Sequence, residues 1–185
     1  MTGSDAVAVV IDALDSAAFS YLFVGGFASN AHGIPRSTRD ADFVIATADD
    51  GIGSLIRRLD CFAFDPPKTF DTASSASRLR TEEDGIPFWL DLFQLTDDPH
   101  ERKQFSRRTS SRYLGRTVYL ATAEDAIIGN LRWSTGGRRR KTVDDVRNVI
   151  AVQGDGLDWD YIFCWCDQHG TRALLEETCR SIPSI

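Results

Sequence analysis

Val24-Gly25-Gly26, followed after thirteen residues by Asp40-Ala41-Asp42, is the stretch that decides the expected fold of this 185-residue chain. Tyr21-Leu22-Phe23-Val24 is an apolar run that ends in the paired glycines, a pattern typical of a buried strand entering a tight turn. Asp40 and Asp42 lie two positions apart, so a strand over 38–47 points both carboxylates to one face. Two hard oxygen ligands on one face form a candidate Mg²⁺ site.

Helices are predicted wherever apolar residues recur at the 3.6-residue spacing. The first, with Ser4 or Asp5 as its N-cap, is expected to bury Val7, Val10, Ile11 and Leu14. The predicted ranges are 5–18, a short helix through 28–32 that ends at Gly33, 47–59, 122 to about 133, a helix through 143–150, one from 159 to 170, and a last short one at 174–175.

Strands are predicted at three further places. Glu83-Asp84-Gly85 supplies a hairpin turn into the strongly apolar strand 86–93, while the Ser/Thr-rich stretch 72–81 suits a polar edge strand. Pro66-Pro67 predicts a loop, and 117–120 a short strand. Asp91 is the exception within 86–93, because a carboxylate in so apolar a strand is costly to bury unless it is paired or binds a metal.

Length and composition describe an ordinary globular protein. The chain can hold one core, or a catalytic core with a small helical appendage. It has no apolar stretch long enough to span a membrane, and Met1–Asp5 lacks the basic start of a secretory signal, so we predict a cytoplasmic location and no membrane partner. The four cysteines show no paired CxxC spacing and are expected to be buried free thiols.

Charge is distributed unevenly along the sequence. The net charge is −6, yet residues 101–141 carry 11 basic and 3 acidic side chains. A local basic segment can attract polyphosphate or RNA even in an anionic protein. A solvated face that balances acidic neighbours explains the same pattern equally well.

Taken together, the strand, the Gly-Gly turn, the following helix, the Asp-x-Asp strand and a later strand with a third Asp resemble the nucleotidyltransferase fold of the DNA polymerase β superfamily. Gly25-Gly26-Phe27-Ala28, His32-Gly33, Pro35-Arg36 and Thr38-Arg39-Asp40 are similar to the matching stretch of the bacterial AbiEii-like minimal nucleotidyltransferases. The resemblance covers about residues 20–178. It implies an α+β fold with a small mixed β-sheet flanked by helices, a nucleotidyltransferase core at 1–121, and a C-terminal helical region at 122–185 packed on the core.

This resemblance implies a metal-dependent reaction, in which an NMP group moves from an NTP to a hydroxyl acceptor by in-line displacement. Asp40 and Asp42 would bridge two Mg²⁺ ions, with Mn²⁺ as an alternative metal. Asp91 would complete the acceptor-side metal site and act as general base. Two simpler interpretations stay open: solvated acids at Asp40 and Asp42, and an arginine partner for Asp91.

Nucleotide binding is implied for a second group of residues. Gly25 and Gly26 would let the backbone approach the phosphates, and amides at the following helix N-terminus would favour the anion. Arg36 and Arg39 are candidates for phosphate contact, and Asp145 matches a family aspartate. Asn130 stands where the family offers a lysine, so the missing charge would have to come from Arg132, Lys141 or the run Arg138-Arg139-Arg140.

The resemblance leaves the acceptor open: a tRNA end, a protein or a small molecule. Relatives of this type include toxins of toxin-antitoxin systems, which implies an antitoxin protein as a further partner. A catalytically silent nucleotide- or partner-binding module is the main alternative, favoured by Asn130. A metal-dependent phosphohydrolase that uses the same three acids is the third interpretation.

Overall fold

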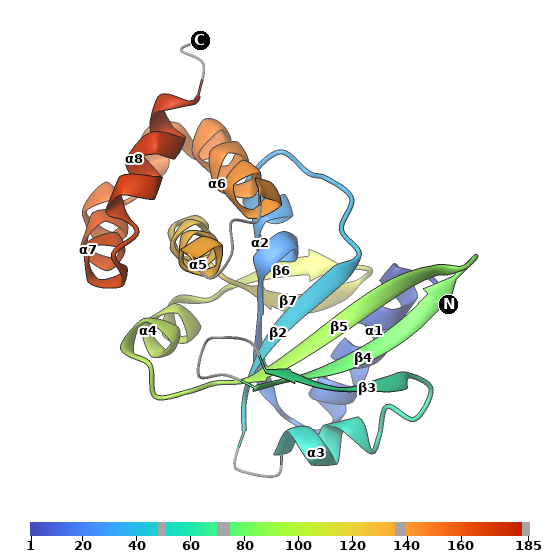
Figure 1. The fold of residues 1–185 in the computed structure, drawn as a ribbon. Coiled ribbons are helices and arrows are strands. Elements are labelled where there is room, and N and C mark those ends of the chain that lie inside the picture. The colour runs from blue at the N-terminus through green and yellow to red at the C-terminus, as the bar shows by residue number, and fades with distance from the viewer. Residues whose placement is uncertain (48–50, 70–74, 136–139, 183–185) are drawn as a thin grey trace. The chain divides into compact units, whose positions relative to one another are not determined.

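A computed structural model describes residues 1–47, 51–69, 75–135 and 140–182 (Figure 1). Its helices are α1 Gly3–Ser16, α2 Gly25–His32, α3 Gly51–Ile56, α4 Pro99–Arg107, α5 Ala123–Thr135, α6 Arg140–Gln153, α7 Trp159–His169 and α8 Arg172–Arg180, with a 3₁₀ turn η1 at Gly154–Gly156. Its strands are β1 Ser20–Val24, β2 Asp40–Ala46, β3 Ala63–Thr69, β4 Ser75–Glu83, β5 Ile86–Gln94, β6 Thr109–Tyr113 and β7 Arg116–Leu120.

The chain divides into two compact units. The first, here called the sheet unit, comprises residues 1–23 and 38–120, and the second, the helical unit, comprises residues 24–37 and 121–185. Residues 24–37, which the sequence prediction groups with the core, therefore cluster with the C-terminal helices. Within the described residues, no helix is both long and apolar enough to cross a membrane.

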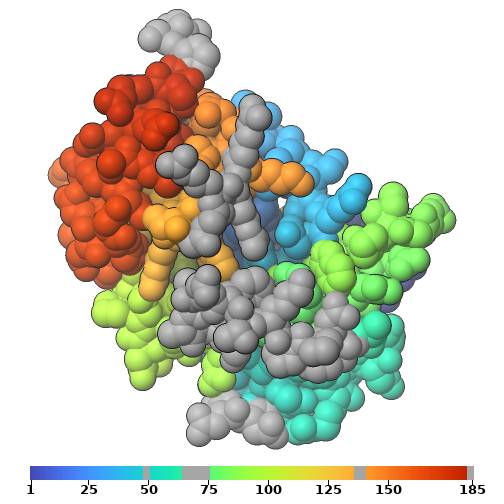
Figure 2. Space-filling view, viewed as in Figure 1, coloured from blue at the N-terminus to red at the C-terminus, as the bar shows by residue number. Residues whose placement is uncertain are grey.

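The sheet unit is built on one mixed sheet, in which the described strands follow the order β3-β4-β5-β2-β1-β7-β6. β2 pairs with β5 and β1 with β7 in parallel, whereas β3, β4 and β5, and also β6 and β7, pair antiparallel. This mixed sheet with flanking helices confirms the predicted α+β class. Figure 2 shows the end of the β4–β5 hairpin, in green, at the molecular surface, where residues 82–86 are exposed.

Strand alternation gives the sheet one apolar face. On β2, Ala41, Phe43 and Ile45 are fully buried, and Leu90 and Leu92 of β5 are buried beside them. Helix α1 packs on β4 and β5, burying Val7, Val10, Ile11 and Leu14, the predicted stripe. The carboxylates at alternate positions of β2 therefore lie on the opposite face of the sheet.

Several predicted boundaries need correction. Thr2, not Ser4 or Asp5, caps α1, and Asp5 completes its capping box. Pro66-Pro67 lies in β3 rather than in a loop, because β3 is the edge strand and its pairing with β4 shifts register between Asp65 and Lys68, where prolines are tolerated.

Two further differences concern strands. β4 is internal rather than an edge strand, since β3 covers it, and residues 72–74 of the predicted range lie outside the described residues. α4 and β6 were not predicted. Asp98-Pro99 was the missed signal for α4, because Asp98 accepts from the Glu101 amide and Pro99 occupies the first turn.

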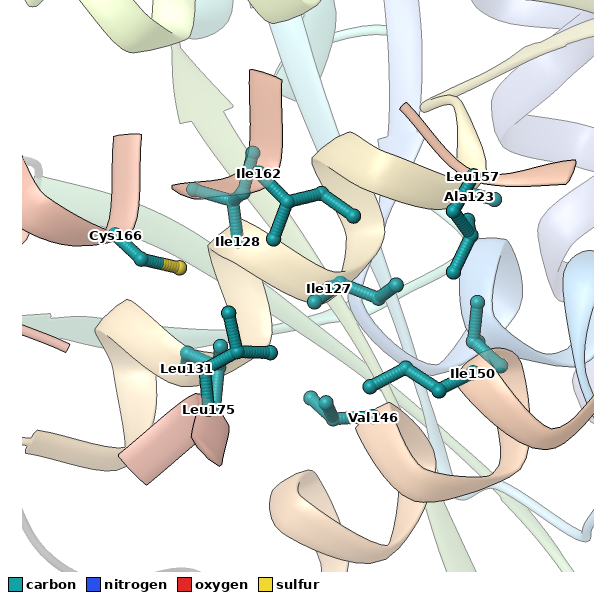
Figure 3. Packing of buried hydrophobic residues seen from close by; sticks show 11 residues of the cluster. Ala123, Ile127, Ile128, Leu131, Val146, Ile150, Leu157, Ile162, Cys166 and Leu175 are labelled. Atoms are coloured by element: carbon teal, nitrogen blue, oxygen red, sulfur yellow. The ribbon is translucent and has the colours of Figure 1, made fainter. Parts of the chain in front are cut away.

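The helical unit has a core of its own. Figure 3 shows the side chains that α5, α6, α7 and α8 bury against one another. The cluster consists of Ala123, Ile127, Ile128, Leu131, Val146, Val149, Ile150, Leu157, Ile162, Cys166 and Leu175. α2 packs on α5 and α6, and its last residue is anchored because His32 Nε2 lies 2.7 Å from the Ala121 carbonyl oxygen and Gln153 Nε2 donates to the His32 carbonyl oxygen at 2.6 Å.

Gly33→Ala is expected to destabilise the protein by about 1–3 kcal/mol, the usual cost of overpacking. A Cβ at Gly33 would lie 2.8 Å from the Val149 backbone nitrogen and 3.0 Å from the Asn148 carbonyl carbon, so α2 would have to move away from α6. Gly156→Ala is the matched control, since its Cβ would meet nothing within 4 Å. Urea unfolding of both variants measures the difference, and equal midpoints would contradict the close approach.

Candidate active site

Strand register places six side chains in two adjacent rows on the face of the sheet opposite α1. Three strands, β2, β5 and β4, contribute one residue to each row. One row is Asp42, Asp91 and Arg78, and the next is Asp40, Trp89 and Arg80. We call this set the charged face. The three predicted catalytic aspartates therefore share one face, with Asp42 directly opposite Asp91.

Asp91 is held by an arginine. Arg78 Nε donates to Asp91 Oδ1 at 2.6 Å and Arg78 Nη2 donates to Asp91 Oδ2 at 2.5 Å. Both side chains are largely buried, with exposed fractions of 15% for Arg78 and 4% for Asp91. The apolar strand can bury this carboxylate because both of its oxygens accept charge-assisted hydrogen bonds. Asp91 thus has the arginine partner that the sequence left open, and it also faces Asp42.

The electrostatic environment of Arg78 includes all three carboxylates. Its hydrogen bonds to Asp91 raise the pKa of the Arg78 guanidinium above its ordinary value, and the charges of Asp91, Asp42 and Asp40 act in the same direction against desolvation. Asp42 is half-buried and Asp40 is exposed, with the Thr38 hydroxyl donating to its Oδ1. Arg78 is therefore a positive charge on which all three carboxylates of the charged face act.

Both arginines of the charged face lie over the ring of Trp89. The guanidinium carbon of Arg78 lies 5.2 Å from the Trp89 ring centroid, and that of Arg80 lies 5.9 Å from it. Arg80 is more exposed and pairs with Glu82 at 3.5 Å rather than with an aspartate of the charged face. Arg78 is thus held by the largely buried Asp91 as well as by Trp89, whereas the pair of Arg80 with Glu82 is exposed and of the weaker kind.

The charged face has the donor chemistry for a hard divalent cation, since carboxylate oxygens are the ligands that Mg²⁺ prefers. Among the residues that the structure describes, however, no three His, Cys, Asp or Glu side chains form a group ready to hold a metal ion. Asp40 and Asp42 would hold an ion on this face, with Asp91 as a third oxygen donor.

The Gly-Gly turn lies in the helical unit and opens α2. Gly25 has φ +57°, a left-handed conformation that favours glycine, and α2 has no side-chain cap at its N-cap residue Val24. Ser29 Oγ donates to the Gly25 carbonyl oxygen at 3.0 Å. Asn130 Nδ2 in turn donates to Ser29 Oγ at 2.8 Å. Asn130 is buried, so its visible role is to support the start of α2; nucleotide binding by Gly25, Gly26 and Asn130 stays a prediction.

Arg36 and Asp145, both predicted to bind nucleotide, are paired with each other inside the helical unit. Arg36 Nε donates to Asp145 Oδ1 at 2.5 Å and Arg36 Nη2 donates to Asp145 Oδ2 at 2.6 Å. Asn30 fixes the arginine from the other side, because its side chain exchanges two hydrogen bonds with the Arg36 backbone. Arg39 is exposed in the sheet unit, where its carbonyl oxygen accepts from the Trp89 amide at 2.9 Å.

The basic segment 101–141 is divided between the two units. It runs through α4, β6, β7 and α5 into α6, and so belongs to both units. Several of its arginines have local partners: Arg102 pairs with Asp97, Arg116 with Asp12, and Arg108 lies over the Phe105 and Tyr119 rings. Residues 136–139, which include Arg138 and Arg139, lie outside the described residues.

Arg78 is the site residue that the sequence interpretation missed, although a signal for it was present. Asp84 and Gly85 both have positive φ, which defines a two-residue hairpin turn. Counting outward from such a turn pairs Glu83 with Ile86 and, five rungs further on, Arg78 with Asp91. The turn dipeptide therefore identifies the partner of the anomalous carboxylate.

The fold of the chain is the nucleotidyltransferase fold, as comparison with solved structures shows. An antigenic nucleotidyltransferase-like protein from Paracoccidioides brasiliensis matches with a TM-score of 0.56 at 17% identity, over 97% of this chain and 93% of that one. The antibiotic-resistance factor ANT(2'')-Ia matches with a TM-score of 0.62 at 13% identity, over 96% of both chains. The lincosamide antibiotic adenylyltransferase LnuA, bound to lincomycin, matches with a TM-score of 0.53 at 15% identity, over 79% of this chain and 95% of that one.

At sequence identities of 13–17%, these comparisons show that the fold is shared and show nothing further. No protein-family model and no curated protein sequence matches the chain. The predicted nucleotidyltransferase fold is thereby confirmed, whereas the resemblance to the AbiEii-like family stays a prediction.

Proposed function

We propose that this protein is a Mg²⁺-dependent nucleotidyltransferase that moves an NMP group from an NTP to a hydroxyl acceptor. The observation that carries the proposal is the register of β2 and β5, which sets Asp42 directly opposite Asp91, with Asp40 on the same face. Three carboxylates on one sheet face are the chemistry that phosphoryl-group transfer with divalent cations needs. The nucleotidyltransferase fold supports this interpretation of the charged face over that of a solvated strand.

Each group has a defined task in this proposal. Asp40 and Asp42 hold the metal, which supplies positive charge to the phosphate oxygens when it is bound. Asp91 accepts the proton of the attacking hydroxyl and fixes that oxygen for in-line displacement. The backbone amides that open α2, starting at Gly25, bind the triphosphate. Arg36 and Arg39 are proposed to contact phosphate as well.

The acceptor is proposed by class. ANT(2'')-Ia has been solved with adenylyl-2''-tobramycin and LnuA with lincomycin, so a small molecule with a free hydroxyl is one candidate. A tRNA end, as in toxins of toxin-antitoxin systems, is the other, with an antitoxin protein as a further partner. Phosphate contacts by arginines would make tRNA binding weaken steeply with salt, whereas an uncharged small-molecule acceptor would show no such slope.

The direct test is label transfer from each of the four α-³²P-NTPs, with Mg²⁺ or Mn²⁺, to total tRNA, tobramycin and lincomycin. The proposal expects labelled acceptor and released pyrophosphate in at least one combination. Labelled NMP with no labelled acceptor would instead indicate a phosphohydrolase. Tight NTP binding without any turnover would indicate the catalytically silent module.

A further inference from the structure

Both oxygens of the Asp91 carboxylate already bind a cation, the guanidinium of Arg78. The contact is bidentate, at 2.6 and 2.5 Å, and Asp91 lies almost wholly out of solvent. A guanidinium stays protonated under all ordinary conditions, so this positive charge cannot be removed by titration. Each Asp91 oxygen keeps a lone pair beyond its bond to Arg78, so a divalent cation that coordinates Asp91 either shares an oxygen with the guanidinium or displaces it.

Charge balance on the face favours displacement. Arg78 experiences the charges of Asp42 and Asp40 as well as that of Asp91. It is thus positioned where it neutralises the acidic residues that a metal would otherwise neutralise. Adding a divalent ion next to a fixed guanidinium places like charges together, which costs free energy at short range in a partly desolvated site.

Trp89 makes displacement of Arg78 feasible. Its ring lies 5.2 Å from the guanidinium carbon, on the outer side of the hairpin from Asp91. A cation over an indole face keeps part of its stabilisation without any carboxylate. Arg78 therefore has a second contact within the sheet unit when Asp91 is taken by a metal.

We propose that Arg78 is a resident counter-cation of Asp91 that competes with the divalent metal for this carboxylate and thereby sets the metal affinity of the charged face. The proposal rests on the proposed function only in taking Asp91 as a metal ligand. Arg78 acts as a positioning residue: it holds Asp91 in place before the metal binds. If the paired state is populated at 90–99%, the apparent metal affinity is lowered about 10- to 100-fold relative to an unpaired Asp91.

The test measures Mn²⁺ binding by calorimetry, with Mn²⁺ alone as the probe, to the unmodified chain, Arg78→Gln and Arg80→Gln. We expect Arg78→Gln to bind Mn²⁺ at least about tenfold more tightly. Arg80→Gln is the matched control, because Arg80 lies on the same face and over the same Trp89 ring but pairs with Glu82. Its Mn²⁺ affinity should stay within about twofold, since exposed charges act weakly through solvent.

A thermal-unfolding readout separates competition from a merely structural role. Without Mn²⁺, Arg78→Gln should melt at least about 5 °C lower, because it leaves a buried carboxylate unpaired. Saturating Mn²⁺ should restore most of that loss, and should raise the melting temperature of Arg80→Gln no more than that of the unmodified chain. Arg78→Lys, which keeps the charge without the bidentate contact, should show intermediate Mn²⁺ affinity and serves if Arg78→Gln does not fold.

Equal or weaker Mn²⁺ binding by both Arg78 variants overturns the competition, as does absence of Mn²⁺ binding in all variants. The proposed function can be refuted separately from this inference. If Arg78→Gln binds Mn²⁺ more tightly, as expected, but no combination of NTP and acceptor gives transfer, the inference holds and the proposed function is wrong. Metal binding that depends on Asp42 but not on Arg78 removes this inference and leaves the proposed function intact.

Discussion

Asp42→Asn is expected to lower the rate of nucleotidyl transfer by a factor of about 10³, because it removes one charged ligand from the electrostatic centre of the reaction. Asparagine keeps the size of the side chain and one carbonyl oxygen, so the half-buried position stays filled. Asp42 lies opposite Asp91 in the ladder, which places it to bind the proposed metal and to face the proposed general base. Single-turnover transfer of labelled NMP, with the NTP and acceptor that the label-transfer test identifies, measures the loss.

Asp97→Asn provides the control for this result. Asp97 is an aspartate that pairs with Arg102, and its side chain is 98% exposed and lies outside the charged face. Its replacement should leave transfer within about twofold and stability within ±0.5 kcal/mol, as is usual for surface sites. Full activity in Asp42→Asn, with folding verified by circular dichroism, would refute the assignment of the charged face as the catalytic site.

The sequence allowed the fold to be predicted mainly because local and long-range signals agree. Period-two alternation in 40–46 and the apolar run 86–93 both appear as strands, and their side-by-side pairing follows from the family resemblance rather than from either stretch alone. Pro66-Pro67 misled the prediction, because a local rule for loops was overridden by an edge position in the sheet. Whether a strand lies at the edge or in the interior of a sheet depends on the order of the strands, and composition does not determine that order.

The candidate site was predictable in its acids and not in its cations. Asp40 and Asp42 follow from strand periodicity, and Asp91 is marked by its apolar surroundings. To predict Arg78 as the partner of Asp91, the register of the hairpin has to be known. Arg36 and Asp145 lie 109 positions apart in the sequence, and no local rule predicts a pair at that separation. Asn130 illustrates a third case: the resemblance marked the position, while only the packing of α2 on α5 shows what the amide bonds to.

The Arg36–Asp145 pair gives the second large effect, this time on stability. Asp145→Asn and Arg36→Gln should each lower the free energy of unfolding by about 2–4 kcal/mol, since each leaves one member of a bidentate, mostly buried ion pair without its partner. The exposed fractions are 30% for Arg36 and 5% for Asp145, so the loss should be the larger in Arg36→Gln, which strands the more deeply buried charge. For a chain of this size the melting temperature should fall by about 5–12 °C.

Glu176→Gln is the comparison variant, because Glu176 pairs with Arg172 one helical turn away on the exposed side of α8. Its replacement should cost only about 0.3–0.5 kcal/mol. The double variant of Arg36 and Asp145 should be less destabilised than the sum of the two single variants, and strict additivity in this cycle would argue against a direct pair.

Nucleotide affinity then separates two roles of Arg36. Asp145→Asn keeps the guanidinium and frees it for a phosphate, whereas Arg36→Gln removes the charge. If Arg36 contacts the triphosphate, as we propose, NTP affinity falls about tenfold or more in Arg36→Gln and is retained in Asp145→Asn, despite comparable losses of stability. Parallel losses of affinity in both variants would instead limit Arg36 to holding the segment between α2 and β2 against α6.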